Sequence, residues 1–375
     1  MTQPRFSNRR TLTRRGLFAL GGAAALALVG CTPETPSGGP PPAPTPSAGA
    51  SPVPSPSPAA GKPVLRFTIG MHIEPLGTTA QGFRSGAVEG RQLDYADRTF
   101  FERQSEDIRA VAAIVERHGG RMTVQAQSPF TSAAIANGSS ILRDLADAGH
   151  EIALHFHEDA HLGASSSTLP VSRWTAVLEE ELALVRQASG VDRIRSWSGG
   201  NLYPHLCEAA AAAGLEVNSD WKNPASQSTP LELTGVNPWR PAGGTDGREF
   251  SAFSRHDPAG PVIFLPEGAY DREDFAGARR SGQFGGDEAY FAYLSERLRA
   301  SLAASRADRV NVAHVTIHPG EFRGGGGAPF AVIDRFLTET VDPLAASGEV
   351  AWSTFAGMAD AFIAWEQANP GAAPR

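Results

Sequence analysis

Cysteine is scarce in this sequence, with two residues among 375. Cys31 closes an apolar stretch near the start of the chain, and Cys207 lies in the alanine-rich run "LCEAAAAAGL". Cys31 is expected to be modified (below), which leaves Cys207 without a partner and excludes an intramolecular disulfide. Cys207 is expected to be a small buried helix residue. Stability must therefore come from the hydrophobic core alone.

A hydrophobic run long enough to span a membrane is missing near the start of the chain. The uncharged residues 16–30 within "RRTLTRRGLFALGGAAALALVGC" are too few for a stable span and follow an arginine-rich segment. "TRRGLF" resembles a twin-arginine export signal, and "LVGC" resembles a lipobox. Residues 1–30 are therefore expected to be a lipoprotein signal peptide, with cleavage before Cys31 and lipid attached to its sulfur.

Residues 31–62 contain almost nothing that could form a core. They are rich in Pro, Ser and Gly, a composition typical of a solvated tether. Together with the lipid on Cys31, this tether predicts an exported protein anchored to the outer face of the bacterial cytoplasmic membrane or to the periplasmic side of the envelope.

An excess of positive charge is absent. The net charge is −7, and removal of the signal peptide deletes five arginines and no acid, which gives −12. An acidic surface argues against nucleic acid or anionic lipid as the partner of the folded part.

The folded part, residues 63–370, alternates strand patterns with helix patterns. Helices are predicted over residues 104–119, 172–190 and 287–305, and a long loop over Lys222–Gly260. Eight strands are predicted over 64–74, 121–127, 151–157, 193–199, 215–221, 261–268, 310–318 and 349–355. This alternation predicts an α/β fold, an irregular (β/α) barrel. A doubly wound sheet is less well supported because no glycine-rich phosphate loop follows the first strand.

Polar side chains gather where the predicted strands end. Since side chains alternate along a strand, each strand divides into an apolar face and an opposite face that carries these residues. Barrel enzymes place their chemistry at the carboxyl ends of the strands. The polar residues at these ends are His72, Glu74, Gln125, Gln127, His155, His157, Asp220, Glu267 and His318.

The stretch "ALHFHEDAH" is the densest part of this set. His155 and His157 are two apart on one strand and share a face, and two imidazoles with a carboxylate suit zinc or a similar divalent ion. If the chain turns after Phe156, then His157 and His161, four apart, could pair instead. Glu158, Asp159 and His161 are equally well explained as a polar loop. Both ligand sets stay open at this point.

Several passages resemble the polysaccharide deacetylase family, metal-dependent carbohydrate esterases on irregular (β/α) barrels. The most specific is "LRDLADAGHEIALH"; "RIRSWSGGNLYPHLCEAAAAAGLEVNSDW", "HVTIHPGEF" and "GEVAWSTFAGMADAF" resemble later motifs. The departures are equally specific. The family's opening T-F-D-D-G reads "FTIGMHIEP" here, so that His72 and Glu74 are the nearest replacements for two aspartates. The family's H-[ST]-x-x-H has Asp159 as its last residue here, and Trp197 stands where a proline is expected.

The resemblance implies removal of an acetyl group, N-acetyl rather than O-acetyl, from a cell-envelope or peptidoglycan-like polysaccharide. It implies a divalent metal, zinc, and a metal site drawn from Glu74, His155, His157 and His161. His72 or Asp159 is expected to be the general base and His318 the general acid. The residues predicted to contact or orient substrate are Gln127, Trp197, Asp220 and Trp221.

Two other readings are compatible with the sequence. A non-catalytic carbohydrate-binding lipoprotein would share the tether and barrel, and the missing aspartates would mean lost catalysis. A glycoside hydrolase needs two carboxylates beside a cleft, for which Glu267 and Asp220 are candidates. The second reading leaves the histidines unexplained.

Overall fold

The computed structural model describes residues 61–74, 87–88, 91–92, 94–163, 165–200, 203–221, 235–242, 253, 255–269, 286–320 and 330–374. The predicted signal peptide, Cys31 and nearly all of the predicted tether lie outside these residues. Among the residues described, none of the helices combines the length and the apolar character that crossing a membrane requires.

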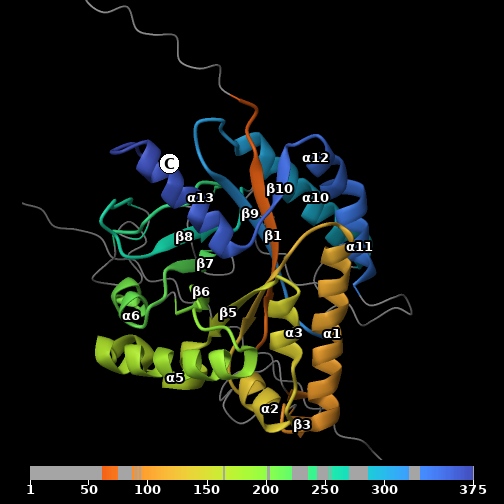
Figure 1. Ribbon diagram of the computed structural model, residues 1–375, viewed down its shortest axis with the longest axis vertical. Coiled ribbons are helices and arrows are strands. Elements are labelled where there is room, and N and C mark those ends of the chain that lie inside the picture. The colour runs from red at the N-terminus through yellow and green to blue at the C-terminus, as the bar shows by residue number, and fades with distance from the viewer. Residues whose placement is uncertain are drawn as a thin grey trace, which may run out of the picture. The chain divides into compact units, whose positions relative to one another are not determined.

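Eight parallel strands form one curled sheet, which confirms the predicted strands and the irregular (β/α) barrel (Figure 1). The neighbours run β8-β7-β6-β5-β4-β1-β9, and β10 pairs with the start of β1 on the edge whose far end pairs with β4. Their bounds are β1 Leu65–His72, β4 Thr123–Ala126, β5 Glu151–Phe156, β6 Ser196–Gly199, β7 Val217–Trp221, β8 Ile263–Pro266, β9 Asn311–Ile317 and β10 Val350–Trp352. A small antiparallel pair, β2 Ala87–Val88 and β3 Arg91–Gln92, stands apart.

Helices cover the outer face of the sheet (Figure 1). The three predicted helices are confirmed, although the first begins six positions earlier, at Arg98, where the Asp97 side chain accepts a hydrogen bond from the Phe100 N–H. The helices are α1 Arg98–Arg117, α2 Phe130–Ala136, α3 Ile141–Asp147, α4 Glu158–Leu162, α5 Val171–Ser189, α6 Leu206–Ala212, α10 Asp287–Ala304, α11 Ala331–Phe336, α12 Asp342–Ala346 and α13 Phe355–Ala368. Two short segments, 3₁₀-helical Ser166–Thr168 and π-helical Leu337–Val341, complete the set.

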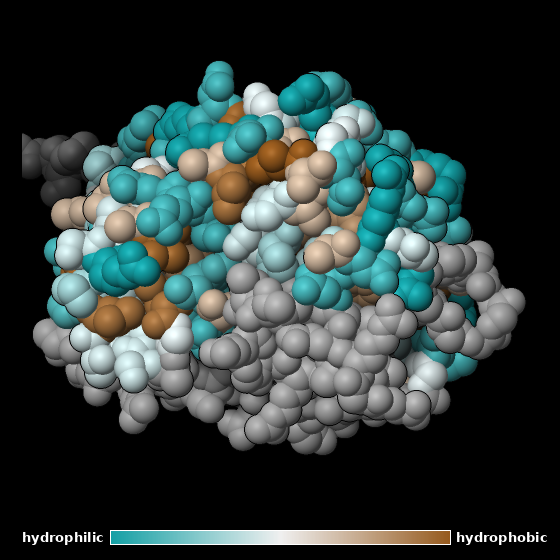
Figure 2. Space-filling model, turned by 90° about the horizontal axis from the view of Figure 1, so that it is seen from below, coloured by the Kyte–Doolittle hydropathy of each residue, from teal (hydrophilic) through white to brown (hydrophobic). Residues whose placement is uncertain are grey.

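The alternation along β1 divides its residues as predicted. Leu65, Phe67, Ile69 and Met71 are at most 1% exposed and belong to the main apolar core. The opposite face points into the barrel and ends in His72, which is also buried. Because all the strands are parallel, their carboxyl ends meet on one face of the barrel. Figure 2 views the molecule from below, the side toward which β1 runs in Figure 1; among its coloured residues, hydrophilic ones surround small, separate hydrophobic areas.

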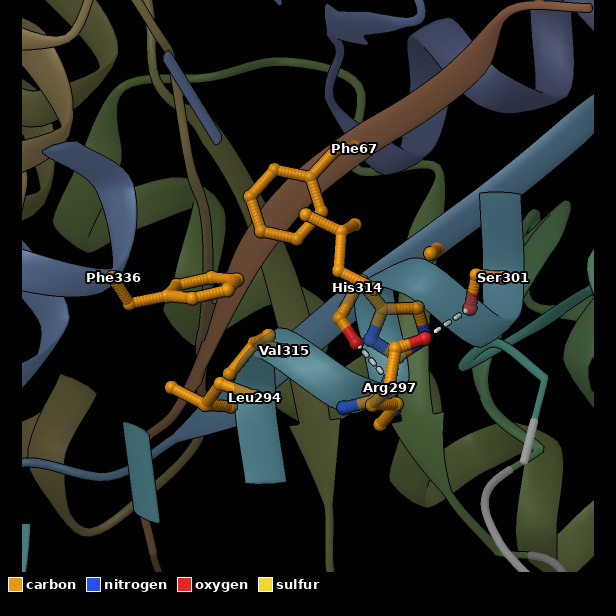
Figure 3. A pocket seen from close by; sticks show the side chains of 9 residues that line it. Phe67, Leu294, Arg297, Ser301, His314, Val315 and Phe336 are labelled. Atoms are coloured by element: carbon orange, nitrogen blue, oxygen red, sulfur yellow. Dashed lines mark hydrogen bonds between the residues drawn. The ribbon is translucent and has the colours of Figure 1, made fainter. Parts of the chain in front are cut away.

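Arg297 of α10 joins the two strands between which the barrel closes. The His314 N–H of β9 donates to the Glu267 carbonyl just after β8 (3.0 Å), and the Arg297 guanidinium donates to the carbonyls of both residues. Arg297 also pairs with the Glu267 carboxylate at 3.4 Å, with both side chains at most 5% exposed. Figure 3 shows this guanidinium beside His314, with Phe67, Leu294 and Phe336 nearby. The buried Arg297 side chain thus stabilises the contact between β8 and β9, in addition to the backbone hydrogen bond between them.

His118, at the end of α1, lies between two carboxylates. Its Nε2 is 3.0 Å from Asp334 Oδ1 and its Nδ1 is 2.8 Å from Asp342 Oδ2. Asp342 follows Asp334 by eight positions, which in a regular α-helix would turn it about 80° away. The π-helical Leu337–Val341 lies between them and adds a residue to the turn, which brings both carboxylates to one side.

We expect Arg297→Met to lower the free energy of unfolding by about 3–5 kcal/mol, because it leaves the Glu267 carboxylate buried without its cation. Arg299→Met on the exposed side of the same helix is the matched control, with a change within about 0.5 kcal/mol. Chemical denaturation measures both. Equal effects of the two substitutions would contradict the role assigned to Arg297.

His118 should stabilise the protein only when it is protonated. Burial acts to lower its pKa, but hydrogen bonds to Asp334 and Asp342 raise it above the usual value. A histidine whose pKa is higher in the folded state than in the unfolded state contributes its full stabilisation below the unfolded-state pKa. This stabilisation is lost as pH rises through the folded-state pKa. We expect His118→Gln to cost about 1 kcal/mol at pH 5.5 and almost nothing at pH 10. A pH-independent difference in unfolding free energy from wild type would contradict this.

Candidate metal centre

Three strands bring the predicted site residues to the carboxyl-end face of the barrel. Glu74 lies two residues beyond the end of β1, His155 lies within β5 and His157 follows it, and His318 follows β9. β1 pairs with β9 and with β4, and β4 in turn pairs with β5, so the carboxyl ends of these strands gather on one face, although 244 positions separate Glu74 from His318 (318 − 74).

Glu74, His155 and His157 form the centre of the site. Glu74 Oε2 is 2.7 Å from His157 Nε2 and 3.7 Å from His155 Nε2. One ligand atom from each of the three residues can be chosen so that all lie within 4.8 Å of one another. Among the described residues, this is the group of His, Cys, Asp and Glu side chains with metal-site geometry. Of the two ligand sets left open by the sequence, the structure assembles the one with His155 and His157.

Ser198 orients His155. The parallel register of β5 and β6 places the two residues opposite each other, and Ser198 Oγ lies 2.6 Å from His155 Nδ1. With Nδ1 engaged, Nε2 is the nitrogen that faces Glu74. A hydrogen bond on the far ring nitrogen is the usual device for orienting a metal-binding imidazole. Ser198 is not among the site residues predicted from the sequence; its position on the inward face of the strand next to His155 is the signal that could have indicated it.

The charges in this cluster stabilise one another. Burial acts to raise the pKa of Glu74, but hydrogen bonds from His155, His157 and His318 hold it well below the usual range. Burial acts to lower the pKa of His157, but its contacts with Asp159 and Glu74 raise it to about 10. In the metal-free protein at neutral pH, the cluster therefore contains an ionised carboxylate and a protonated His157.

His318 and His72 flank the centre. His318 Nε2 is 3.1 Å from Glu74 Oε1, the carboxylate oxygen not used by His157, and its side chain is 29% exposed. The His72 ring stacks on His155, with centroids 4.2 Å apart, and meets His318 edge-on at 5.6 Å. The predicted acid and one predicted base are thus next to the predicted ligands, and their catalytic roles stay predictions.

His161 and Gln127 face away from this centre. His161 lies on α4, where its Nε2 is 2.7 Å from Gln127 Oε1 and its Nδ1 is 3.5 Å from Glu181 Oε1. Gln127 is fully buried and bonds to protein atoms through both ends of its amide. The structure therefore does not group His161 with the other expected ligands, nor does it present Gln127 to a substrate.

The other predicted site residues divide into three groups. Asp159 lies 3.6 Å from His157 Nδ1 and is 47% exposed, so it stays a candidate base. Trp197 is fully buried in the apolar core, which corrects the expectation that it stacks on a sugar, because its ring has no accessible face. Asp220 and Trp221 end β7, and their side chains, like Cys31, lie outside what the structure describes.

The glycosidase reading loses one of its two carboxylates. Glu267 is 2% exposed and its carboxylate is paired with Arg297 on the closing side of the barrel. A buried, ion-paired carboxylate is a poor proton donor or nucleophile toward a sugar in solvent. The structure assigns Glu267 to the framework instead.

The residues of the centre fit a divalent cation. One carboxylate and two imidazoles are a donor set that zinc and similar divalent ions accept, with three protein ligands leaving an open position for chemistry. The hydrogen bond to Ser198 fixes the orientation of His155 as a ligand. The Glu74 side chain is 19% exposed, so a cation can reach the centre from solvent.

Comparison with known proteins identifies the fold. No protein-family model and no curated protein matches the sequence. The solved structures that are similar over most of their length include the following three. A chain of Mycobacterium smegmatis assigned to the polysaccharide deacetylases has a TM-score of 0.52 and 15% identity, covering 83% of this chain and 94% of that one. A PuuE allantoinase has a TM-score of 0.54 and 15% identity (84% and 94%). A chain of Pseudomonas aeruginosa PAO1, also assigned to the polysaccharide deacetylases, has a TM-score of 0.52 and 16% identity (82% and 92%).

At these identities the likeness concerns the fold. The chain has the (β/α) barrel of the polysaccharide deacetylases, as its motifs predicted. The same barrel is also that of the allantoinase, so the fold alone does not choose a substrate.

Metal binding should release a proton from His157. An imidazole must be neutral to bind a metal, and the pKa of His157 near 10 keeps it protonated at pH 7. We expect zinc affinity to rise about tenfold per pH unit between pH 6 and 9, with about one proton released. Calorimetric titration in buffers of different ionisation enthalpy counts the protons. The exposed His205→Gln is the control. Affinity that does not change with pH would contradict the charge assigned to His157.

Proposed function

We propose that the protein is a metal-dependent hydrolase that removes acetyl groups from a polysaccharide. The observation that carries this proposal is the convergence of Glu74, His155 and His157 beside His318, at the carboxyl ends of a deacetylase-like barrel. Clusters of titratable groups at that face are where barrel enzymes perform chemistry.

Glu74, His155 and His157 would hold the cation, with zinc as the first choice for this donor set. The cation would supply Lewis-acid polarisation of the acetyl carbonyl and lower the pKa of water at the site. Glu74 then has two tasks, since its Oε2 faces the ligand histidines and its Oε1 faces His318. One carboxylate thereby holds the proposed acid next to the residues that would bind the cation.

The proton transfers fall to the flanking residues. His72 or Asp159 accepts the proton of the attacking water, and His318 donates a proton to the departing amine. His318 is suited to the second step, because Glu74 Oε1 holds its Nε2 3.1 Å away and its side chain is accessible from solvent. His72 is buried against His155, whereas Asp159 is half exposed, so the two candidate bases differ in access.

The finer assignments rest on the sequence. An N-acetyl group on a cell-envelope or peptidoglycan-like glycan, with Asp220 and Trp221 among the substrate contacts, is the proposed substrate. The lipobox-like "LVGC" and the arginine-rich signal support export and a lipid on Cys31 that holds the enzyme at the outer face of the cytoplasmic membrane. The Pro- and Ser-rich residues 31–62 would let the barrel reach a polymer some distance from the membrane.

We expect the purified wild-type protein to contain about one divalent ion per chain and His155→Ala to contain almost none. The matched control is His150→Ala: His150 is similarly buried but lies immediately before β5, at the opposite end of that strand from the site, where it contacts Glu116. Metal content is measured by elemental analysis of protein prepared without chelator. A wild type that stays empty after addition of zinc, cobalt or manganese would exclude the metallohydrolase.

His318→Asn should lower turnover about 10²- to 10⁴-fold and leave the metal content unchanged. Acetate release from oligomers of N-acetylglucosamine is the primary assay, with O-acetylated xylan as the competing acetyl donor. Allantoin, which has no acetyl group, is tested separately by following the opening of its ring. Release from the O-acetylated polymer alone would move the proposal to an esterase. Affinity for a glycan without bound metal and without turnover of any of these substrates would favour the carbohydrate-binding lipoprotein.

A further inference from the structure

Gln127 is buried directly behind the candidate metal centre, and both ends of its amide are occupied. Its Oε1 accepts a hydrogen bond from the backbone N–H of His157 (3.1 Å), and its Nε2 donates to the carbonyl of Ile73 (3.3 Å). Ile73 immediately precedes Glu74. A single side chain therefore connects the backbone beside one candidate ligand to the backbone of another.

A second layer determines which way this amide points. His161 Nε2 is the second hydrogen-bonding partner of Gln127 Oε1, at 2.7 Å, and the His161 ring stacks on Phe156 with centroids 5.1 Å apart. Glu181 lies 3.5 Å from His161 Nδ1 and accepts hydrogen bonds from Ser128 N and Oγ, at 2.8 and 2.7 Å. A flipped amide would direct its NH₂ group at the His157 N–H and its oxygen at the Ile73 carbonyl, so only one orientation satisfies all the partners.

We propose that Gln127 is a positioning residue that holds the ends of β1 and β5 at the separation at which Glu74 and His157 share one cation. His161 and Glu181 lock its amide from behind. This inference rests on the proposed metal-dependent function and gives Gln127 and His161 a role in place of substrate contact and metal ligation. It also accounts for His161, a histidine of the dense polar stretch that lies outside the ligand cluster.

The two hydrogen bonds of the Gln127 side chain, to the His157 N–H and the Ile73 carbonyl, are called the clamp here. The burial of Gln127 is explained better by the clamp than by packing alone. An amide that is completely buried is costly unless every polar atom is paired, and an apolar side chain of the same volume would avoid that cost. Gln125 offers the comparison. It lies within β4, two residues before Gln127, and is equally buried. Its side-chain amide donates to Ser219 Oγ at 3.0 Å and, among the described residues, does not bond to the strand ends that carry the candidate ligands.

The test is zinc and cobalt affinity of the whole chain, measured by calorimetry after metal removal. Gln127→Met keeps the volume and removes the clamp, and we expect a 10- to 100-fold loss of affinity and an altered cobalt absorption spectrum. Gln125→Met is the matched control, with affinity within about twofold of wild type. Glu181→Gln, which weakens only the outer lock, should lose about three- to tenfold and serves if Gln127→Met fails to fold.

The outcomes separate this inference from the proposed function. A wild type that binds no divalent ion removes the proposed function and, with it, the role of Gln127. Wild-type binding with an unchanged affinity in Gln127→Met, or in a Glu181→Gln variant used in its place, overturns the clamp alone. An equal loss of affinity in Gln125→Met also overturns it, because the effect would then be general loosening of the strand. Thermal unfolding of each variant shows whether a loss of affinity occurs in a folded protein.

Discussion

The arrangement of the site depends on one shared carboxylate. Glu74 lies within 4 Å of His155, His157 and His318, which approach from two other strand ends. A carboxylate removed from most solvent is stable only with compensating positive charge or hydrogen bonds, and the imidazoles provide both. In return, Glu74 keeps His157 protonated in the metal-free state. Cation binding would exchange one positive charge for another, so the centre is arranged for an ion before any ion arrives.

The barrel supplies the geometry that this carboxylate needs. Parallel strands carry their carboxyl ends to one face, and the register of β5 with β6 turns His155 toward Glu74 through Ser198. Closure between β8 and β9 relies on Arg297, whose guanidinium reaches two strand carbonyls from an outer helix. Like Glu74, Glu267 is a carboxylate removed from most solvent and has a cationic partner. The ion pair of Glu267 with Arg297, however, holds the barrel closed and takes no part in the proposed chemistry.

The likeness to the deacetylases holds for the fold but not for the residues of the opening motif. The barrel matches over more than four-fifths of the chain, yet the paired aspartates of the family's opening motif are replaced in "FTIGMHIEP". A carboxylate and two histidines still converge, from positions shifted along β1 and β5. A fold preserves the place where side chains meet more readily than the side chains themselves, which is why the proposed mechanism is built from this chain's own contacts.

The sequence alone determined the eight strands, the three long helices and the face that carries the polar residues, because alternation and helical periodicity record burial directly. It also placed Glu74, His155 and His157 among the candidates. Only the tertiary structure decided which histidines meet Glu74. At Glu158 the chain changes from a strand to the helix α4, so His161 turns to Gln127 and Glu181. The partners Ser198, Gln127 and Arg297 depend on strand register and on contacts between distant segments, which no local pattern encodes.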